Sequence, residues 1–185
     1  MKFKHISMNA LSVRELRESD IAFIIEYWFG AEPEFLEGMG VDLNKMPGKL
    51  EWEQMLQEQL SLPIPDKKSY CIIWELDDQP AGHSNINKIQ FGIEAYMHLH
   101  LWRSDIRQKG MGATLVKMSL PYFFKNYELK NLYSEPYSLN PAPNKTLERV
   151  GFQWVKQHVT TPGWLNFEQP VNLWEMSRER FLSLQ

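Results

Sequence analysis

Cysteine is almost missing from this sequence, which has one, Cys71, among 185 residues. A single thiol cannot close a disulfide within the chain, so a fold held together by disulfides is excluded. Cys71 stands in the apolar run of residues 70–74 and is expected to be a small buried core residue rather than a nucleophile. Sparse cysteine also favours a reducing compartment, and we expect a cytoplasmic protein.

Long apolar runs and dense basic runs are missing as well. No stretch approaches the ~20 apolar residues that cross a bilayer, and residues 1–10 have no apolar core of signal-peptide length. The net charge is −3 and no dense run of lysine and arginine appears, so the basic face that nucleic-acid binding needs is not expected. We therefore expect neither a membrane nor a nucleic acid as a partner.

Repeats and low-complexity linkers are also missing, which predicts a single domain over residues 1–185. Hydrophobic residues make up 43% and charged residues 23% of the chain, a normal balance for a globular protein. Aromatic residues are plentiful, with 7 Trp, 7 Tyr and 10 Phe. Several fall near the segments assigned below to a cleft, so some are expected to line a ligand site.

The periodicity of apolar residues predicts strands and helices that follow one another along the chain. Expected strands are residues 11–16, 69–75, 81–89, 94–102, 131–137 and two or three between 152 and 176. Expected helices are residues 21–29, 50–60, 111–126 and 144–150, with Pro121 predicted to kink or shorten the third. Residues 31–49 are expected to be a mobile loop. This order predicts an α/β fold with a mixed central sheet flanked by helices.

The expected strand at residues 94–102 has two different faces, because side chains alternate along a strand. One face carries only apolar residues and is expected to point into the core. The other face carries Glu94, Tyr96, His98, His100 and Trp102. So many polar and aromatic side chains on one face suit the wall of a cleft better than a buried interface.

A glycine-rich loop follows this strand and leads into the expected helix at residues 111–126. Its residues are Arg107, Gln108, Lys109, Gly110, Met111 and Gly112. Backbone amides at the start of a helix form an anion site together with the helix dipole, and glycine lets a phosphate come close. Arg107 and Lys109 add positive charge, so the loop is predicted to bind a phosphate group.

This loop resembles the Q/R-x-x-G-x-G/A signature of the GNAT superfamily of acyl-coenzyme A N-acyltransferases. Asn140 and the pair Gly151-Phe152 are similar to the superfamily's later N-x-x-A-x-x-x-Y-x-x-x-G-F segment, and the order of elements agrees over nearly the whole chain. The resemblance implies a sheet that splays at a bulged fourth strand, where acyl-coenzyme A, here acetyl-coenzyme A, enters. It implies cofactor contacts from His100, Leu101, Trp102, Arg107, Gln108, Lys109, Gly110, Met111, Gly112, Ala113 and Asn140.

Two positions depart from the family's pattern. The tyrosine that often protonates the leaving thiolate would fall at position 147, which is Leu147, and the usual small residue at position 143 is Pro143. The thiolate would then leave without a proton, or take one from another group such as Tyr137. The sequence leaves both alternatives open.

His98 lies nine residues before Arg107, the spacing of a base histidine in serotonin N-acetyltransferases. His98, Glu135-Pro136 and Asn140 also resemble the branch that contains siderophore lysine N-acyltransferases and aminoglycoside 6'-N-acetyltransferases. In that branch the acidic residue faces the acceptor amine. The resemblance therefore implies catalytic roles for His98 as the base and for Glu135 at the acceptor, beside the alternative proton donor Tyr137.

The chemistry of amine acylation explains these residue types. An ammonium must lose a proton before it attacks a thioester, and a neutral imidazole with an ordinary pKa of about 6.5 can take that proton. Direct transfer to the amine makes no covalent intermediate and has no use for Cys71. His98 and His100 lack a third ligand of metal-site spacing, so no metal is expected.

Most of these assignments have a structural alternative. His98 or His100 could be a satisfied structural histidine, and Glu135 could simply pair with a nearby lysine or arginine. His83 and His158 have no supporting partners in the sequence and are assigned no role.

The expected function is transfer of an acetyl or related short acyl group to a primary amine of a small molecule. Acidic residues in the early loop, Glu32, Glu34 and Glu37, favour a cationic acceptor. Residues 31–49 and 160–164 are expected to shape acceptor specificity. One alternative is a protein N-terminus or lysine as acceptor, which would need an open groove. Another is a non-catalytic acyl-coenzyme A sensor, and a homodimer is compatible with either.

Overall fold

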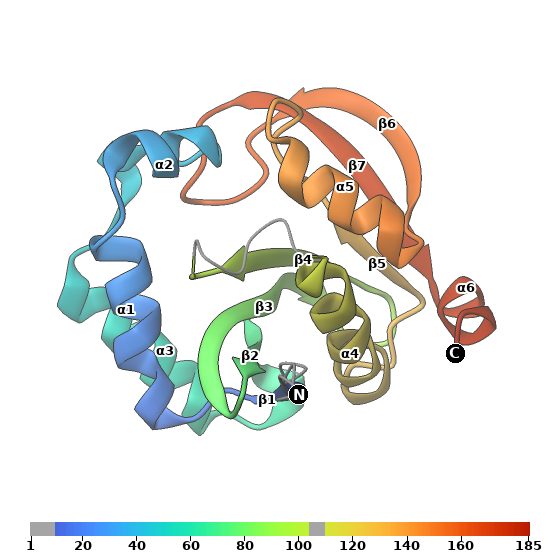
Figure 1. Ribbon diagram of the computed structural model, residues 1–185, viewed down its shortest axis with the longest axis horizontal. Coiled ribbons are helices and arrows are strands. Elements are labelled where there is room, and N and C mark those ends of the chain that lie inside the picture. Colours follow the sequence, from blue (N-terminus) through green and yellow to red (C-terminus); the bar gives the residue numbers. More distant parts are fainter. Residues whose placement is uncertain (1–9, 104–109) are drawn as a thin grey trace, which may run out of the picture.

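A seven-stranded mixed sheet forms the centre of the protein, in a computed structural model that describes residues 10–103 and 110–185. The strands are β1 (Leu11–Glu15), β2 (Tyr70–Leu76), β3 (Gln79–Gln90), β4 (Glu94–Leu101), β5 (Asn131–Ser134), β6 (Gln153–Thr160) and β7 (Gln169–Ser177). They lie in the order β1-β2-β3-β4-β5-β7-β6, and β4 and β5 are the parallel pair. The predicted α/β class with a mixed sheet is confirmed (Figure 1).

Helices cover both faces of this sheet. They are α1 (Ile21–Phe29), α2 (Pro33–Gly38), α3 (Lys49–Ser61), α4 (Met111–Asn126), α5 (Pro141–Val150) and α6 (Arg178–Ser183), with single 3-10 turns η1 (Glu18–Asp20), η2 (Leu43–Lys45) and η3 (Ile64–Asp66). In Figure 1, α1 and α3 lie together on one side of the sheet, and α4 and α5 lie on the other.

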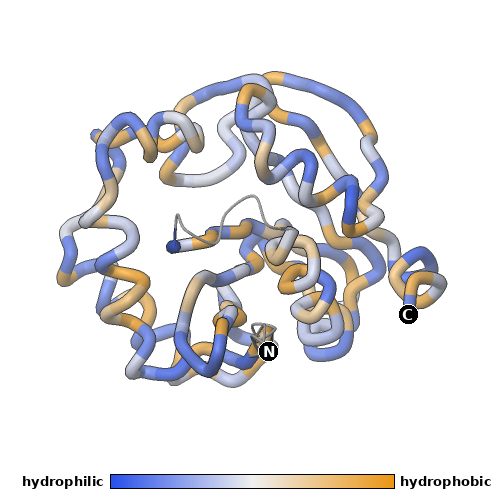
Figure 2. The backbone as a smooth tube through the Cα atoms, viewed as in Figure 1, coloured by the Kyte–Doolittle hydropathy of each residue, from blue (hydrophilic) through white to orange (hydrophobic). Residues whose placement is uncertain are grey.

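Strand β2 is the element shared by the two cores. Its alternate residues Ile72 and Trp74 join the core beneath α4, whereas Cys71 and Ile73 join the core beneath α1 and α3. A strand buried on both faces reads as an unbroken apolar run, which is what residues 70–74 show. Cys71 is buried as predicted, and burial raises the pKa of its thiol, so it stays protonated. Hydrophilic residues instead predominate along β6 and α5 (Figure 2).

Helix α4 keeps its predicted bounds although Pro121 lies inside it, so the prediction of a shortened helix is wrong. The proline removes one backbone donor at a cost of about 3 kcal/mol. Against this, Leu115, Leu120 and Phe123 are at most 3% exposed, and each contributes roughly 1.5–3 kcal/mol by burial. Burial of the apolar face therefore outweighs the lost hydrogen bond.

Other boundaries differ from the predictions. Residues 31–49 contain α2 and η2 instead of loop only, and α6 was not predicted. Strand β5 ends at Ser134 rather than at 137. Helix α5 starts at Pro141 rather than at 144, because Asn140 caps it and a proline in the first turn needs no backbone donor.

The sheet opens between β4 and β5. These strands pair only over Glu94–Tyr96 and Asn131–Tyr133, and β5 then leaves. By contrast β3 follows β4 in continuous register from Tyr96 to Leu101. The irregularity in that ladder falls at Lys88 of β3, which has a φ of 47°, so the expected bulge within β4 is wrong. The splay therefore arises from the departure of β5.

Candidate active site

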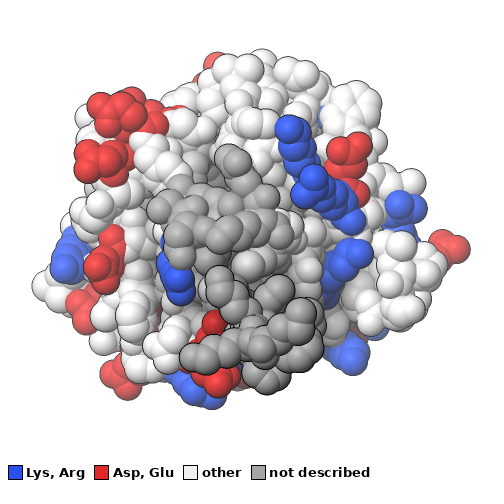
Figure 3. Space-filling model, viewed as in Figure 1, with Lys and Arg blue, Asp and Glu red and all other residues white. Residues whose placement is uncertain are grey.

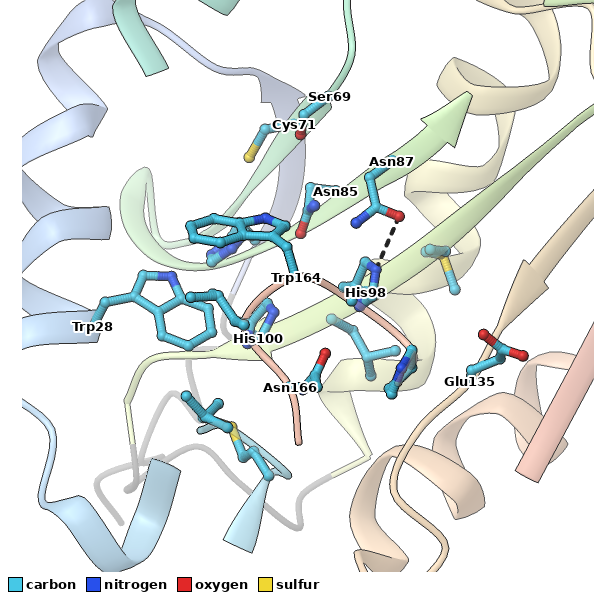
Figure 4. Close-up of a pocket in the computed structure, with 18 of the residues that line it drawn as sticks. Trp28, Ser69, Cys71, Asn85, Asn87, His98, His100, Glu135, Trp164 and Asn166 are labelled. Atoms are coloured by element: carbon cyan, nitrogen blue, oxygen red, sulfur yellow. Dashed lines mark hydrogen bonds between the residues drawn. The ribbon is translucent and has the colours of Figure 1, made fainter. Parts of the chain in front are cut away.

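A cavity of about 550 Å³ lies against the polar face of β3 and β4. Helices α1 and α3 bound it on one side, and the chain after β5 and the loop between β6 and β7 bound it on others. His98 and His100 line it, as the prediction of a cleft face requires (Figure 4). Met97 and Leu99 of the predicted core face also reach the cavity, although Met97 belongs to the core, and Glu94, Tyr96 and Trp102 do not line it. The predicted cleft face is therefore confirmed for His98 and His100.

The neighbouring strand β3 contributes a matching row of side chains. His83 pairs with His100, Asn85 with His98, and Asn87 with Tyr96 across the antiparallel ladder. Residues directly opposite each other in such a ladder point to the same face. His83, Asn85 and Asn87 therefore line the cavity together with the two histidines of β4.

The imidazole of His98 has a defined orientation. Its Nε2 lies 3.2 Å from Oδ1 of Asn87, and an amide oxygen only accepts hydrogen bonds, so Nε2 donates and Nδ1 keeps the lone pair. Burial, followed by the charge of Lys88, lowers the pKa of His98 to about 4. At neutral pH this histidine is uncharged and can accept a proton at Nδ1.

His100 belongs to a stack of neutral rings. The rings of His83 and His100 are stacked 4.7 Å apart, and the Trp28 ring lies 5.0 Å from His100. Trp102 Nε1 donates to His83 Nδ1 at 2.7 Å, and His100 Nδ1 lies 3.3 Å from the hydroxyl of Tyr27. Burial lowers the pKa of His83 to about 3 and holds the pKa of His100 well below its usual value. The His100 side chain is thus an aromatic wall of the cavity.

Glu135 follows the last residue of β5 and lines the same cavity. Its Oε1 lies 3.2 Å from Nε2 of His158, and its Oε2 lies 3.8 Å from Nζ of Lys88. The carboxylate is only 9% exposed, while Lys88 is 45% exposed. Glu135 thus has a nearby lysine, as the structural alternative expected, and also contacts His158, which was assigned no role.

Tyr137 and Asn140 also lie along the cavity, beyond Glu135. The ring of Tyr137 packs edge-on against Phe167 at 5.9 Å. Asn140 caps α5 by accepting a hydrogen bond from the amide of Ala142 at 3.3 Å. Leu147 is 0% exposed within the core, so its position on α5 offers no side chain to the cavity.

The start of α4 carries the described part of the predicted phosphate loop. Gly110 has a φ of 78°, a conformation that favours glycine. A Cβ on Gly112 would meet only Thr146 of α5, at 3.9 Å, so packing within the protein does not require glycine there. Met111 and Ala113 pack against the core beneath α4. Arg107, Gln108 and Lys109 lie outside the described residues.

Basic side chains gather over α5 beside this helix start (Figure 3). Lys145 and Arg149 are both exposed there. The acidic residues Glu32, Glu34 and Glu37 are exposed over α2 instead and do not line the cavity (Figure 3).

Two segments far apart in sequence form a roof over the cavity, defined here as residues 39–45 and 161–168. The carbonyl of Gly40 accepts hydrogen bonds from the side-chain amides of Asn166, at 2.9 Å, and Gln169, at 3.1 Å. The amide of Asp42 also donates to the carbonyl of Leu165 at 2.8 Å. Met39 and Val41 of the first segment and Trp164 of the second line the cavity, so both segments border it, and Trp164 is 51% exposed.

Several site residues were missed from the sequence. His83, Asn85 and Asn87 share one face of the predicted strand 81–89, and pairing that strand with strand 94–102 would have found them. Trp28 and Trp52 were missed because helical aromatic residues usually fill cores.

Neither a metal centre nor a membrane-spanning helix is present among the described residues. Within residues 10–103 and 110–185, no three His, Cys, Asp or Glu side chains come close enough together to hold a metal ion. No helix in the same ranges has the length and apolar character needed to cross a membrane.

Comparison with known proteins gives a family and a fold. Residues 10–153 match the family model of the acetyltransferase (GNAT) domain. Among solved structures, the ribosomal alpha-N-protein acetyltransferase RimL in complex with coenzyme A is 14% identical, with 95% of this chain and 97% of that chain covered and a TM-score of 0.74. The aminoglycoside acetyltransferase AAC(6')-Ib with coenzyme A is 17% identical, with 94% and 98% covered and a TM-score of 0.68.

A third solved structure is similar to the same extent. Spermidine N-acetyltransferase from Vibrio cholerae, in complex with coenzyme A and spermine, is 19% identical, with 93% of this chain and 98% of that chain covered and a TM-score of 0.68. Identities this low show a shared fold only. No curated protein sequence matches the chain.

Proposed function

The chain belongs to the acetyltransferase (GNAT) domain family, and on that premise we propose that it transfers an acetyl or similarly short acyl group from acyl-coenzyme A to the primary amine of a small molecule. The observation that carries the proposal is the orientation of the His98 imidazole in the cavity. This neutral imidazole is held in one tautomer by Asn87 and faces the cavity beside the point where β5 leaves β4.

The residues around the splay fit a coenzyme A chain. Trp102 donates its backbone amide to the carbonyl of Ala81 of β3. Backbone amides point in opposite directions at successive residues of a strand, so the amide of Leu99, three residues earlier, faces away from β3. On that side, no strand among the described residues pairs with β4 beyond Tyr96. The amide groups of a pantetheine can pair with such a strand edge.

The start of α4 fits the phosphates of the same molecule. Gly110 and Gly112 leave room for close approach, and the helix dipole favours an anion at this end. We assign the pyrophosphate to this turn and to Arg107, Gln108 and Lys109. The exposed Lys145 of α5 lies on the basic face beside it (Figure 3).

When bound, acyl-coenzyme A supplies a thioester, whose carbon–sulfur bond breaks as the bond from carbon to the amine nitrogen forms. His98 takes one proton of the acceptor's ammonium at Nδ1 and passes it to solvent, and it takes a second proton from the nitrogen as the amine attacks. Tyr137, which lines the cavity, gives its hydroxyl proton to the departing sulfur. It takes the place of the family's usual tyrosine, since that position is here the buried Leu147, which has no proton to donate. His98 then releases its proton to solvent and Tyr137 regains one, so that both residues end as they began.

Glu135 is proposed to hold the acceptor's ammonium group before that proton is lost. Its contact with Lys88 is long, at 3.8 Å, and Lys88 is 45% exposed, so the lysine can be displaced at small cost. The roof over the cavity supports a small acceptor rather than a protein N-terminus or lysine, which needs an open groove.

Amine-dependent release of free thiol from acetyl-coenzyme A tests the proposal. His98→Gln should lower kcat by about 100-fold or more, the usual contribution of a general base, while the affinity for coenzyme A stays unchanged. Thiol release that does not depend on any amine, or a His98→Gln variant with the wild-type kcat, would contradict the transferase mechanism. Tight coenzyme A binding without turnover of any amine would instead support the sensor alternative.

A further inference from the structure

Three tryptophans from distant parts of the chain meet at one end of the cavity. Trp28 comes from α1, Trp52 from α3 and Trp164 from the roof, and all three line the cavity. The ring centroids of Trp28 and Trp52 are 5.0 Å apart, and those of Trp52 and Trp164 are 5.9 Å apart. With His100 5.0 Å from Trp28, they form an aromatic wall, defined here as these four rings.

Charged groups are scarce along the same cavity. Among the described lining residues, Glu58 and Glu135 are the acidic ones and Lys68 is the basic one. Glu58 and Lys68 are both exposed, so water screens them. Glu135 is the acidic side chain that lies inside, 9% exposed. The other polar lining groups, such as Asn85 and Asn166, are uncharged.

This charge pattern limits the acceptor to one ammonium group. Each buried ammonium without a carboxylate partner costs several kcal/mol of lost hydration. Glu135 can compensate one positive charge, whereas a polyamine or an aminoglycoside brings several. The burial that keeps His98 neutral also favours the uncharged form of the amine, which is the form that attacks.

Resting on the proposed function, we infer that the acceptor is a primary monoamine with an aromatic ring a few carbons from its nitrogen. Figure 4 shows the layout: Trp28 and Trp164 lie at one side, Glu135 lies at the other, and His98 lies between them. The ring stacks on the aromatic wall and the amine reaches His98 and Glu135. The acidic residues of the early loop, which favoured a cationic acceptor, lie outside the cavity and so do not call for more than one positive charge.

Trp164 allows a test that spares the fold, because it is 51% exposed. Trp154 of β6 is a matched control, since it is 56% exposed and does not line the cavity. Calorimetry in the presence of coenzyme A measures binding of 2-phenylethylamine, 2-cyclohexylethylamine, spermidine, kanamycin and a short peptide with a free N-terminus. Thiol release from acetyl-coenzyme A is measured with the same compounds.

We expect 2-phenylethylamine to bind about 10-fold more tightly than spermidine or kanamycin, and more tightly than its cyclohexyl analogue. Trp164→Ala should weaken that binding about 10-fold, Trp164→Phe should restore most of it, and Trp154→Ala should leave it unchanged. Better binding and turnover of a polyamine, an aminoglycoside or the peptide would overturn the inference while the proposed transferase stands. Absence of amine-dependent thiol release with every compound would overturn both.

Discussion

The orientation of His98 by Asn87 can be tested by a change of one functional group. Asn87→Asp keeps the shape of the side chain and replaces the amide by a carboxylate 3.2 Å from Nε2 of His98. An opposite charge at such a distance raises the pKa of a histidine by about 1–3 units. It also offsets the charge of Lys88, which lowers this pKa in the native protein.

The Asn87→Asp substitution should lower kcat in acid and leave kcat almost unchanged near neutral pH. The native pKa of His98 is about 4, so the base is about nine-tenths neutral at pH 5. If the substitution raises that pKa by about 2 units, roughly one-tenth stays neutral at pH 5. The kcat at pH 5 should then fall about 10-fold, whereas the kcat at pH 8 should change less than about 2-fold.

The assay is kcat for thiol release between pH 4.5 and 9 at saturating amine and acetyl-coenzyme A. Gln54→Glu also replaces an amide by a carboxylate, at an exposed position of α3 that does not line the cavity, and should leave the profile in place. Asn87→Ala should lower kcat at every pH, because the imidazole loses its fixed tautomer. An acidic limb at the same pH in Asn87→Asp and the native enzyme would refute His98 as the base.

Three further predictions concern other parts of the molecule. Gly112→Ala should raise Tm slightly, since alanine favours a helix by about 0.5–1 kcal/mol, yet weaken coenzyme A binding at least about 10-fold. Gly38→Ala in α2, where a Cβ also has room, is the control. Unchanged coenzyme A binding by Gly112→Ala would count against the phosphate site. Glu135→Gln should raise the KM for the acceptor about 10-fold and leave the KM for acetyl-coenzyme A unchanged. Glu94→Gln is the control, and an effect of Glu135→Gln on the KM for acetyl-coenzyme A alone would refute the placement of Glu135 at the acceptor. Burial lowers the pKa of His83, His98 and His100, so the unfolded chain binds more protons than the folded protein between about pH 6.5 and 4. The free energy of unfolding should therefore fall as the pH drops through that window, by at most about 4 kcal/mol per pH unit. Urea unfolding at pH 7 and pH 5 measures this, and equal stabilities would contradict it.

The sequence predicted those parts of the site that depend on local patterns. Alternation along residues 94–102 assigned His98 and His100 to the cleft face, and both line the cavity, because strand periodicity is fixed by the backbone. The bounds of α4 followed from the spacing of its apolar residues.

The missed parts depend on contacts between distant segments. The aromatic wall joins residues 28, 52, 100 and 164, and no local pattern distinguishes these tryptophans from core residues. The partners of Glu135 come from β3 and β6, whose neighbours in space are set by the sheet order. Asn140 was assigned to the cofactor, and its place at the start of α5 also gives it a capping role that the two prolines obscured.

The hydrogen bonds to the Gly40 carbonyl bear on how the proposed acceptor site could be redesigned. Gly40 has a φ of 87°, and a Cβ there would collide with Gln169, so the position tolerates glycine alone. Its carbonyl accepts hydrogen bonds from Asn166 in the second roof segment and from Gln169 just after it, while the proposed base His98 is oriented separately by Asn87 on the hairpin of β3 and β4. The roof and the proposed base are thus held in place by different parts of the chain. Residues 162–165 line the cavity and are the ones to exchange in order to admit other amines. Gly40, Asn166 and Gln169 should be kept, because their hydrogen bonds hold the roof in place.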